Sequence, residues 1–294
     1  VLEELFARVP SVNLVRMNFE LDGTFPAHQP DPLQAETLNA LQMRVRETGA
    51  DLGIAPDGDA DRVFFLDEKG EIIPASYITA FIAREILSGG PNAPEQSSVR
   101  GRQAPALQER SAAPRVPPKI FYDIRYTWNA KRAIETYGGT PRVIKVGHAF
   151  ISRALRDEEG IFAGESSGHY FFRTTGYAEG TPLVILYVLR AIARERKPIS
   201  EILAPLVVGY ESGEINFKLK NRDQAAAIMN ELERRYKDGA ITSFDGIAVE
   251  YDEWRFSIRA SNTEPLLRLN VEGKSKELVD QKVQELTAFI IHNS

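Results

Sequence analysis

The chain has 294 residues, of which 43% are apolar and 26% charged, with a net charge of −5 at pH 7 and no cysteine. This length predicts two or three domains with sizeable cores. The negative charge argues against nucleic-acid or membrane-surface partners, and no apolar run reaches membrane-spanning length. Without cysteine, a disulfide framework, a thiolate zinc site and a thiol nucleophile are excluded, and a cytoplasmic location is expected.

Residues 1–88 alternate helix and strand patterns, which is typical of an α/β unit. Asp31 is expected to be a helix N-cap, with Pro32 as the first helical residue. The chain opens with Val1 instead of Met and carries no signal peptide, which suggests a fragment or a processed chain that lacks the first strand of this unit. The expected elements are a strand at 12–16, a helix at 31–48, strands beginning at Leu52 and Val63, and a helix at 76–87.

Residues 89–118 interrupt this pattern, because they are rich in Gly, Pro, Ser, Gln and Arg and have almost no large apolar side chains. Their composition predicts a disordered insertion or linker. Residues 119–208 then form a second α/β unit with the same alternation of patterns. Its expected elements are strands at 119–122, 142–146, 161–163 and 170–172, and helices at 127–137, 149–156 and 181–193.

Residues 209–294 change character, because four strand patterns are combined with only two helical ones. This mixture predicts an α+β unit, a small antiparallel sheet with helices on one face. The expected elements are strands at 214–219, 247–251, 254–259 and 266–271, and helices at 224–237 and 275–291.

Residues 57–62 read Asp-Gly-Asp-Ala-Asp-Arg and lie between two short apolar runs. In an extended backbone the side chains of Asp57, Asp59 and Asp61 would share one face. Three converging carboxylates repel one another unless a cation lies among them, and oxygen ligands favour Mg²⁺ or Ca²⁺. Arg62 fits such a site if an anion, for example a phosphate group, approaches the metal.

Two alternatives to this metal site are a solvated acidic turn and an EF-hand loop. Glu68 stands at the twelfth position of an EF-hand alignment, but the sixth position holds Arg62 instead of Gly. A hydrophobic strand also replaces the flexible half of that loop. The EF-hand is therefore disfavoured. Two further motifs decide between a metal site and a solvated acidic turn.

Those motifs are Gly-Glu-Ser-Ser-Gly-His at residues 164–169 and Arg-Ala-Ser-Asn-Thr-Glu-Pro-Leu-Leu-Arg at residues 259–268. With the acidic loop, in this order and at this spacing, they resemble the α-D-phosphohexomutase superfamily, and most of all its phosphomannomutase/phosphoglucomutase group. The resemblance extends to residues 22–26, 122–125 and 145–148. It implies α/β architecture, with two α/β/α phosphohexomutase-type domains followed by a smaller α+β C-terminal domain.

The residue types of these motifs suit the chemistry that the resemblance implies. Glu165 can accept hydrogen bonds from two adjacent sugar hydroxyls, and Arg259 can donate two to a phosphate group. Many relatives carry Lys where Arg125 stands, and because Arg does not readily lose a proton, we expect Arg125 to neutralise phosphate charge. We call the segment that begins at Arg259 and precedes the strand at 266–271 the phosphate loop. Arg268 lies in that strand and is expected to support the loop.

The resemblance assigns a role to each candidate residue. The implied metal is Mg²⁺, the implied partner is a small-molecule hexose phosphate, and Arg62, Arg125 and His148 are the catalytic candidates. The sugar contacts are Glu165, Ser167 and His169; the contacts to the phosphate that is not transferred are Arg259, Ser261, Asn262 and Thr263; and the metal ligands are Asp57, Asp59 and Asp61.

Relatives also carry an N-terminal domain whose phosphorylated serine stands in a Ser-His-Asn context, and that tripeptide does not occur here. The chain resembles domains two to four. The expected activity is the interconversion of hexose 1- and 6-phosphates of mannose, glucose or both, through a phosphoserine and a bisphosphate, with the serine domain as a missing partner in cis. Alone, the chain is expected to be inactive. The alternatives are a phosphoglucosamine mutase, which usually has Gly where Asn262 stands, and a non-catalytic phosphosugar-binding module.

Overall fold

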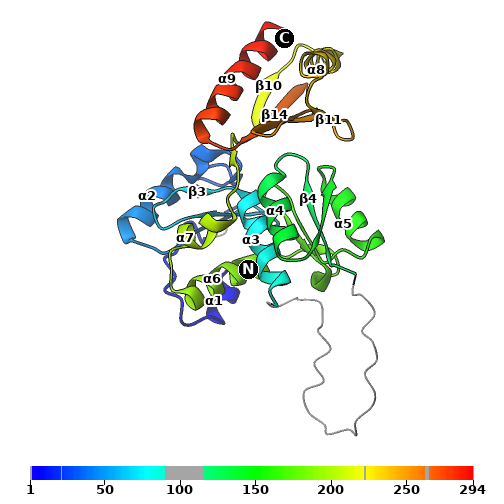
Figure 1. Ribbon diagram of the computed structural model, residues 1–294. Coiled ribbons are helices and arrows are strands. Elements are labelled where there is room, and N and C mark those ends of the chain that lie inside the picture. Colours follow the sequence, from blue (N-terminus) through cyan, green and yellow to red (C-terminus); the bar gives the residue numbers. More distant parts are fainter. Residues whose placement is uncertain (1, 21, 90–115, 222, 262–264, 294) are drawn as a thin grey trace, which may run out of the picture.

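A computed structural model describes residues 2–20, 22–89, 116–221, 223–261 and 265–293. It contains three sheets, one for each of the three units expected from the sequence (Figure 1). The expected insertion at residues 89–118 lies almost wholly outside the described residues. No helix of the described residues is long and apolar enough to cross a membrane.

The first unit is built on a three-stranded antiparallel sheet in the order β1-β2-β3. The hairpin of β1 and β2 pairs Pro56 with Val63, so the six acidic-loop residues form its turn. The elements of this unit are α1 (Leu2–Ala7), the 3₁₀ helix η1 (Ala35–Leu38), α2 (Asn39–Thr48), β1 (Gly53–Pro56), β2 (Val63–Leu66), β3 (Ile72–Ile73) and α3 (Ala75–Leu87).

Two predictions for this unit are wrong. Residues 12–16 form no strand; Val12 and Leu14 pack against the core, but the described residues provide no strand beside them. The helix predicted to start at Asp31 starts at Ala35 as 3₁₀ and continues as α2. Asp31 instead belongs to a turn, where its carboxylate accepts a hydrogen bond from the amide of Leu33.

The second unit contains a five-stranded sheet in the order β5-β4-β6-β7-β8. Strands β5, β4 and β6 are parallel, whereas β7 and β8 continue the sheet as antiparallel strands. Its elements are β4 (Lys119–Asp123), α4 (Trp128–Thr136), β5 (Thr140–Ile144), α5 (His148–Asp157), β6 (Phe162–Gly164), β7 (Tyr170–Phe172), the 3₁₀ helix η2 (Arg173–Thr175), β8 (Ala178–Glu179), α6 (Thr181–Glu195), α7 (Ile199–Leu203) and the 3₁₀ helix η3 (Ala204–Leu206).

Alternate residues of this sheet face two different cores, as the period of two along a strand requires. Ile120 and Tyr122 face the larger core with α3, α4 and α6, while Phe121 between them faces a smaller core under α5. Helices therefore cover both faces of the sheet (Figure 1). The larger core also includes Val63 and Phe65 of β2, so the first two units share one apolar interior.

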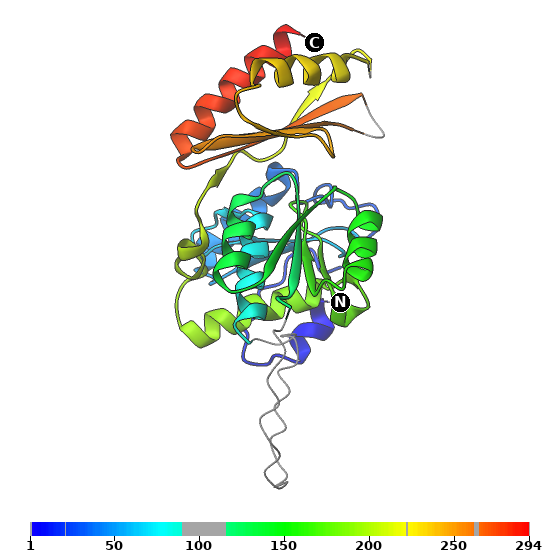
Figure 2. The same ribbon diagram turned by 45° about the vertical axis from the view of Figure 1, so that its right-hand side comes forward.

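The third unit is an antiparallel sheet in the order β10-β14-β13-β12-β11, with β9 paired to β14. Helices α8 and α9 cover the face that is turned away from the rest of the chain, so the other face looks toward the first two units (Figures 1 and 2). The α+β prediction is confirmed. The elements are β9 (Tyr210–Glu211), β10 (Ile215–Lys218), α8 (Asp223–Arg235), β11 (Ala240–Thr242), β12 (Ile247–Glu250), β13 (Trp254–Ala260), β14 (Leu266–Gly273) and α9 (Lys276–His292).

A buried ion pair of the third unit binds the backbone of the second unit. Glu272 on β14 accepts hydrogen bonds from the backbone N–H groups of Thr127 (2.9 Å) and Trp128 (3.0 Å), at the start of α4. A carboxylate at this place satisfies amides that have no partner within the helix. Glu272 also pairs with Arg255 of β13 at 2.6 Å, and both side chains are almost fully buried.

Arg255 extends this contact to the loop that follows β4. Its Nη1 donates to the carbonyl oxygen of Arg125 and its Nη2 to that of Ile124, both at 3.0 Å. We call the pair of Arg255 and Glu272 the inter-unit latch. Because the latch holds the backbone of Arg125, the third unit helps to place a side chain that the sequence marks as a site residue.

Candidate functional site

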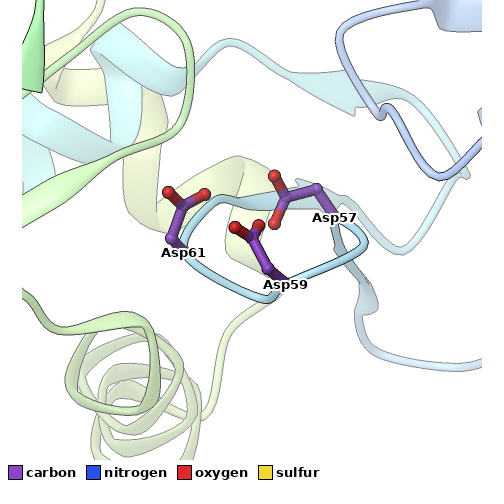
Figure 3. Close-up of side chains that lie close together, drawn as sticks. All are labelled: Asp57, Asp59 and Asp61. Atoms are coloured by element: carbon purple, nitrogen blue, oxygen red, sulfur yellow. The ribbon is translucent and has the colours of Figure 1, made fainter.

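The three carboxylates of the acidic loop converge. Asp57, Asp59 and Asp61 each offer an oxygen, and these oxygens lie within 4.8 Å of one another. Figure 3 shows the three side chains beside one another on the loop. Asp57 is buried, Asp59 exposed and Asp61 half-buried, so the group reaches from the interior to solvent.

The convergence expected from the sequence is present, but the geometry assumed for it is wrong. The loop is a turn and not an extended segment, because Ala60 adopts a left-handed conformation with φ of 62°. The amide of Ala60 donates to the carbonyl oxygen of Asp57 at 3.2 Å, and the amide of Asp57 donates to the carbonyl oxygen of Arg62 at 3.3 Å. This folded turn, and not the alternation of a strand, brings the carboxylates together.

Arg62 is bound by one carboxylate of the loop and by one outside it. Its Nε donates to Oδ2 of Asp57 at 2.6 Å, and its Nη1 donates to Oδ1 of Asp31 at 3.2 Å. Burial acts to raise the pKa of Asp57, but the hydrogen bonds from Arg62 outweigh it, so that the pKa of Asp57 is lowered. Asp57 is therefore held as an anion, as a metal ligand must be.

The donor set fits a hard divalent cation. Burial raises the pKa of Asp61, and the negative charges of Asp57 and Asp59 raise it further. The charge of His169 opposes this effect but does not cancel it. Such mutual repulsion is relieved by a cation that binds all three oxygens. The described residues contain no other group of three or more potential ligands of this kind.

The second motif forms the hairpin between β6 and β7. We call residues 164–169 the sugar hairpin, after the role that the sequence resemblance implies for them. The amide of Glu165 donates to the carbonyl oxygen of His169, and the amide of Gly168 donates to the carbonyl oxygen of Glu165, both at 2.9 Å. Gly168 has φ of 91°, and a Cβ there would lie 2.6 Å from the ring of Phe64. The tight turn and the close contact with β2 both require glycine at this position.

The side chains of this hairpin connect to the acidic loop. Nδ1 of His169 lies 2.8 Å from Oε2 of Glu165, and its Nε2 lies 3.4 Å from Oδ1 of Asp61. Ser167 Oγ is 3.0 Å from the same Nδ1. Burial acts to raise the pKa of Glu165, but the hydrogen bond with His169 and the charge of Arg125 lower it to about 2. Glu165 is thus an ionised acceptor at neutral pH.

Arg125 is buried among carboxylates. It binds Asp123 with two nitrogens, at 3.2 and 2.8 Å, and its Nη2 lies 3.3 Å from Oε1 of Glu165. On the other side its Nη1 is 3.7 Å from Oε2 of Glu214. The same Nη2 donates to Ser167 Oγ at 3.3 Å. Arg125 therefore joins the sugar hairpin to the third unit.

The third motif follows β13. Arg259, at the end of that strand, and Arg268 of β14 are cross-strand neighbours. Both approach the carboxylate of Glu214, Arg268 at 3.4 Å and Arg259 at 4.0 Å. Ser261 is buried, and its amide donates to the carbonyl oxygen of Leu266 at 2.8 Å. Asn262 and Thr263 lie outside the described residues.

The arginines near Glu214 are incompletely satisfied. The Nε atoms of Arg259 and Arg268, and Oε2 of Glu214, are buried and have no hydrogen-bond partner among the described residues. Burial, followed by the charge of Arg125, lowers the pKa of Arg259, and Glu214 opposes this effect. Buried donors with excess positive charge suit an anionic ligand with several oxygens.

His148 stands apart from these contacts. It is the first residue of α5, its side chain is 58% exposed, and Nδ1 contacts Glu179. Its ring meets that of Phe171 edge-on, with centroids 5.3 Å apart. The preceding amide, of Gly147, donates to Oε1 of Glu165 at 3.2 Å, so the backbone at His148 is tied to the sugar hairpin although its side chain is not.

Comparison with known proteins agrees with the three motifs. Models of the phosphoglucomutase/phosphomannomutase α/β/α domains II and III match residues 1–70 and 104–210, and the model of the C-terminal domain matches residues 214–288. The chain belongs to this family. The same family was expected from the acidic loop and the two later motifs.

Individual relatives extend over nearly the whole chain. A phosphomannomutase of Methanocaldococcus jannaschii is 36% identical over 290 residues, which cover 99% of this chain and 57% of the relative. One of Vibrio cholerae is 37% identical over 303 residues, which cover 99% and 58%. A solved phosphoglucomutase/phosphomannomutase family protein of Burkholderia thailandensis superposes with a TM-score of 0.76 at 26% identity, over 97% of this chain and 56% of that one. The chain thus spans somewhat more than half the length of these relatives.

Sequence reasoning missed Asp31, Asp123 and Glu214, three residues that contact the predicted site residues. Asp31 binds Arg62, Asp123 binds Arg125, and Glu214 lies between three arginines, of which Arg268 was expected only to support the phosphate loop. Asp123 stands two residues before Arg125 in the chain and offered a local signal. The partners of Asp31 and Glu214 lie 31 or more positions away, and no pattern of neighbouring residues indicates them.

Proposed function

We propose that this chain is the metal-, sugar- and phosphate-binding part of a phosphohexomutase that interconverts the 1- and 6-phosphates of mannose, glucose or both. One continuous series of contacts supports this most. It runs from Asp61 through His169, Glu165, Arg125 and Glu214 to Arg268 and so joins all three motifs. This continuity supports the proposal that one connected site holds a metal, sugar hydroxyls and a phosphate group.

In this proposal the chain's residues bind and orient the hexose phosphate. Glu165 accepts hydrogen bonds from sugar hydroxyls, with Ser167 and His169 beside it. Arg259, Ser261, Asn262 and Thr263 hold the phosphate group that is not transferred. Asp57, Asp59 and Asp61 hold Mg²⁺, which supplies positive charge that stabilises a phosphoryl group in transfer. Arg62 and Arg125 add positive charge next to that group, and His148 lies beside the sugar hairpin.

The phosphoryl carrier is proposed to be a phosphoserine in a further domain of the same protein, as the family resemblance implies, with a hexose bisphosphate as intermediate. A transfer of this kind needs a nucleophile aligned with the substrate oxygen. The present chain alone is therefore expected to bind hexose phosphates without converting them. A cytoplasmic location, where such metabolites occur, is part of the same proposal.

Binding and turnover can be tested separately. Titration calorimetry with mannose 1-phosphate should show binding by the parent chain, strong loss in Arg259→Ala, and no change in Glu253→Gln, which removes an exposed carboxylate of the same unit. A coupled assay primed with the hexose bisphosphate should show no conversion until a domain that carries the phosphoserine is added. Absence of hexose phosphate binding by the parent chain would contradict the proposed function.

A further inference from the structure

Glu214 occupies an unusual place for a carboxylate. It lies between β9 and β10 of the third unit, directly before β10. Three guanidinium groups surround it, those of Arg268 at 3.4 Å, Arg125 at 3.7 Å and Arg259 at 4.0 Å. Two of these arginines belong to the strands that flank the phosphate loop, so an acidic residue stands where the proposed function places a phosphate group.

The contacts between the carboxylate of Glu214 and the three guanidinium groups are long. Charge-assisted hydrogen bonds between guanidinium and carboxylate are usually about 2.7–2.9 Å long. All three distances of Glu214 exceed this length, and one of its oxygens is buried without a hydrogen-bond partner among the described residues. Glu214 is therefore held by charge and hardly by directed bonds, which makes it easy to displace.

The arginines have unused capacity that a phosphate group can fill. The Nε atoms of Arg259 and Arg268 are buried and unpaired among the described residues. A carboxylate brings one negative charge and two oxygens, whereas a phosphate monoester brings up to two charges and three oxygens. The larger anion can satisfy more of these donors at once.

Glu214 also has room to leave. Its side chain is 22% exposed, so that part of it lies at the surface although Oε2 is buried. The preceding residue is Gly213, which has φ of 74° and no atom within 4 Å of the place where a Cβ would stand. A glycine with open surroundings permits a change of backbone direction next to Glu214.

We propose that Glu214 is an internal counter-anion that sets the phosphate affinity of this site: its carboxylate competes with a bound phosphate group for Arg259 and Arg268 and turns away when phosphate binds. This inference rests on the proposed function, because it takes the arginines as a phosphate site. Glu214 keeps three like charges together before the ligand arrives, and the ligand has to replace it. The affinity for phosphate is thereby lower than the arginines alone would give.

The same contacts would also be made by a residue that only orients the arginines. The two roles predict opposite signs. A competitor weakens phosphate binding, so that its removal tightens binding. An orienting residue strengthens phosphate binding, so that its removal weakens it.

The test is titration calorimetry with inorganic phosphate at constant ionic strength. We expect Glu214→Gln to bind phosphate about tenfold more tightly than the parent chain, since one competing charge is lost beside the ligand. Glu214→Ala, which also removes any hydrogen bond from the side chain, should tighten binding in the same direction. The matched control, Glu253→Gln, removes one exposed charge of the same unit and should bind as the parent does.

Equal or weaker phosphate binding by both Glu214 variants, with circular dichroism unchanged, would overturn the inference. Binding that is detectable only in the Glu214 variants would support it. Failure of the proposed function gives a different result. In that case Arg259→Ala would bind phosphate with the same affinity as the parent chain, or neither the parent chain nor any variant would bind phosphate.

Discussion

The three carboxylates of the acidic loop differ in what holds them. Asp57 is buried and bonded to both the backbone and the side chain of Arg62, so that its removal would disturb the turn itself. Asp61 lies next to His169 of the sugar hairpin. Asp59 is exposed and points toward the same centre. A change at Asp59 therefore tests metal binding with the least effect on the fold.

Asp59→Asn should weaken Mg²⁺ binding at least about tenfold, because the affinity of an oxygen site depends on the number of charged ligands. Titration calorimetry with MgCl₂ measures this, and thermal unfolding without metal should give the same melting temperature as the parent. Asp51→Asn, an exposed carboxylate outside the loop, is the matched control. Equal Mg²⁺ affinity in Asp59→Asn and the parent would refute the metal assignment.

Glu165 should contribute stability that depends on pH. Its pKa is lowered from 4.5 to about 2 in the folded chain. The contribution is therefore fully present above about pH 4.5 and is lost as pH falls toward 2. Burial acts to lower the pKa of His169, but the hydrogen bond and the charge of Glu165 raise it above its usual value. The difference in free energy of unfolding between the parent and Glu165→Gln should therefore grow as pH falls from 7 to about 5.5 and His169 becomes protonated. Below about pH 5.5 the difference should shrink, because the unfolded chain binds a proton at Glu165.

Urea unfolding at several pH values measures that difference. Glu231→Gln, which alters an exposed pair with Arg234, is the control and should show little dependence on pH. If the difference for Glu165→Gln stayed constant down to pH 3, the carboxylate would not be held as an anion by His169 and Arg125.

At the scale of single elements, strands and buried helices could be predicted well from the sequence. For example, Ile120 and Tyr122 pack in one core and Phe121 in the other, which is the period of two that a strand requires. The short strands β3, β8, β9 and β11, of two or three residues each, were not predicted, and the strand predicted at 12–16 has no partner strand among the described residues. A further error falls where a polar residue has a distant partner. Asp31 resembles an N-cap by its neighbours, but its carboxylate binds Arg62, and the helix begins further along the chain.

The residues of the candidate site also differ in whether the sequence could predict them. The three motifs, at residues 57–62, 164–169 and 259–268, are short and continuous in sequence, so the order of their residues was enough to recognise the family. Glu214 and the inter-unit latch could not be recognised in this way, because their partners are distant in the chain. Arg268 lies more than 50 positions after Glu214. The latch residues contact the backbone of residues 124–128, at least 130 positions away. Single acidic residues at strand ends are otherwise common surface groups.

The sugar hairpin depends on glycine for two separable reasons. Gly168→Ala should destabilise the fold by about 1–3 kcal/mol from the left-handed backbone alone, and by more because the added methyl group would meet Phe64. Gly176→Ala is the matched control, because Gly176 has φ of 75° with no atom within 4 Å of the place of a Cβ. Urea unfolding of both variants should show the larger loss at Gly168; equal losses would mean that the contact with β2 is not tight.

At the scale of the whole molecule, the first two units share one core, whereas the third has a core of its own. The third unit is coupled to the second by polar contacts that include the inter-unit latch. In addition, Asp245 of the third unit accepts a hydrogen bond from the amide of Val146 at 2.9 Å. The site is built across this junction, since Arg125 lies on one side and Arg259 and Arg268 on the other.

Breaking the latch should therefore separate the units. Glu272→Gln leaves Arg255 buried without its counter-charge, and the loss of one partner of a buried pair costs about 3–5 kcal/mol. It also weakens the acceptor of the first amides of α4. In differential scanning calorimetry we expect the parent to unfold in one transition, and the variant to show an earlier transition of one part of the chain followed by a second. Arg234→Gln, which breaks an exposed pair of the same unit, should keep the parent's profile. A single transition in Glu272→Gln, merely shifted to lower temperature, would show that the latch contributes stability without coupling the units.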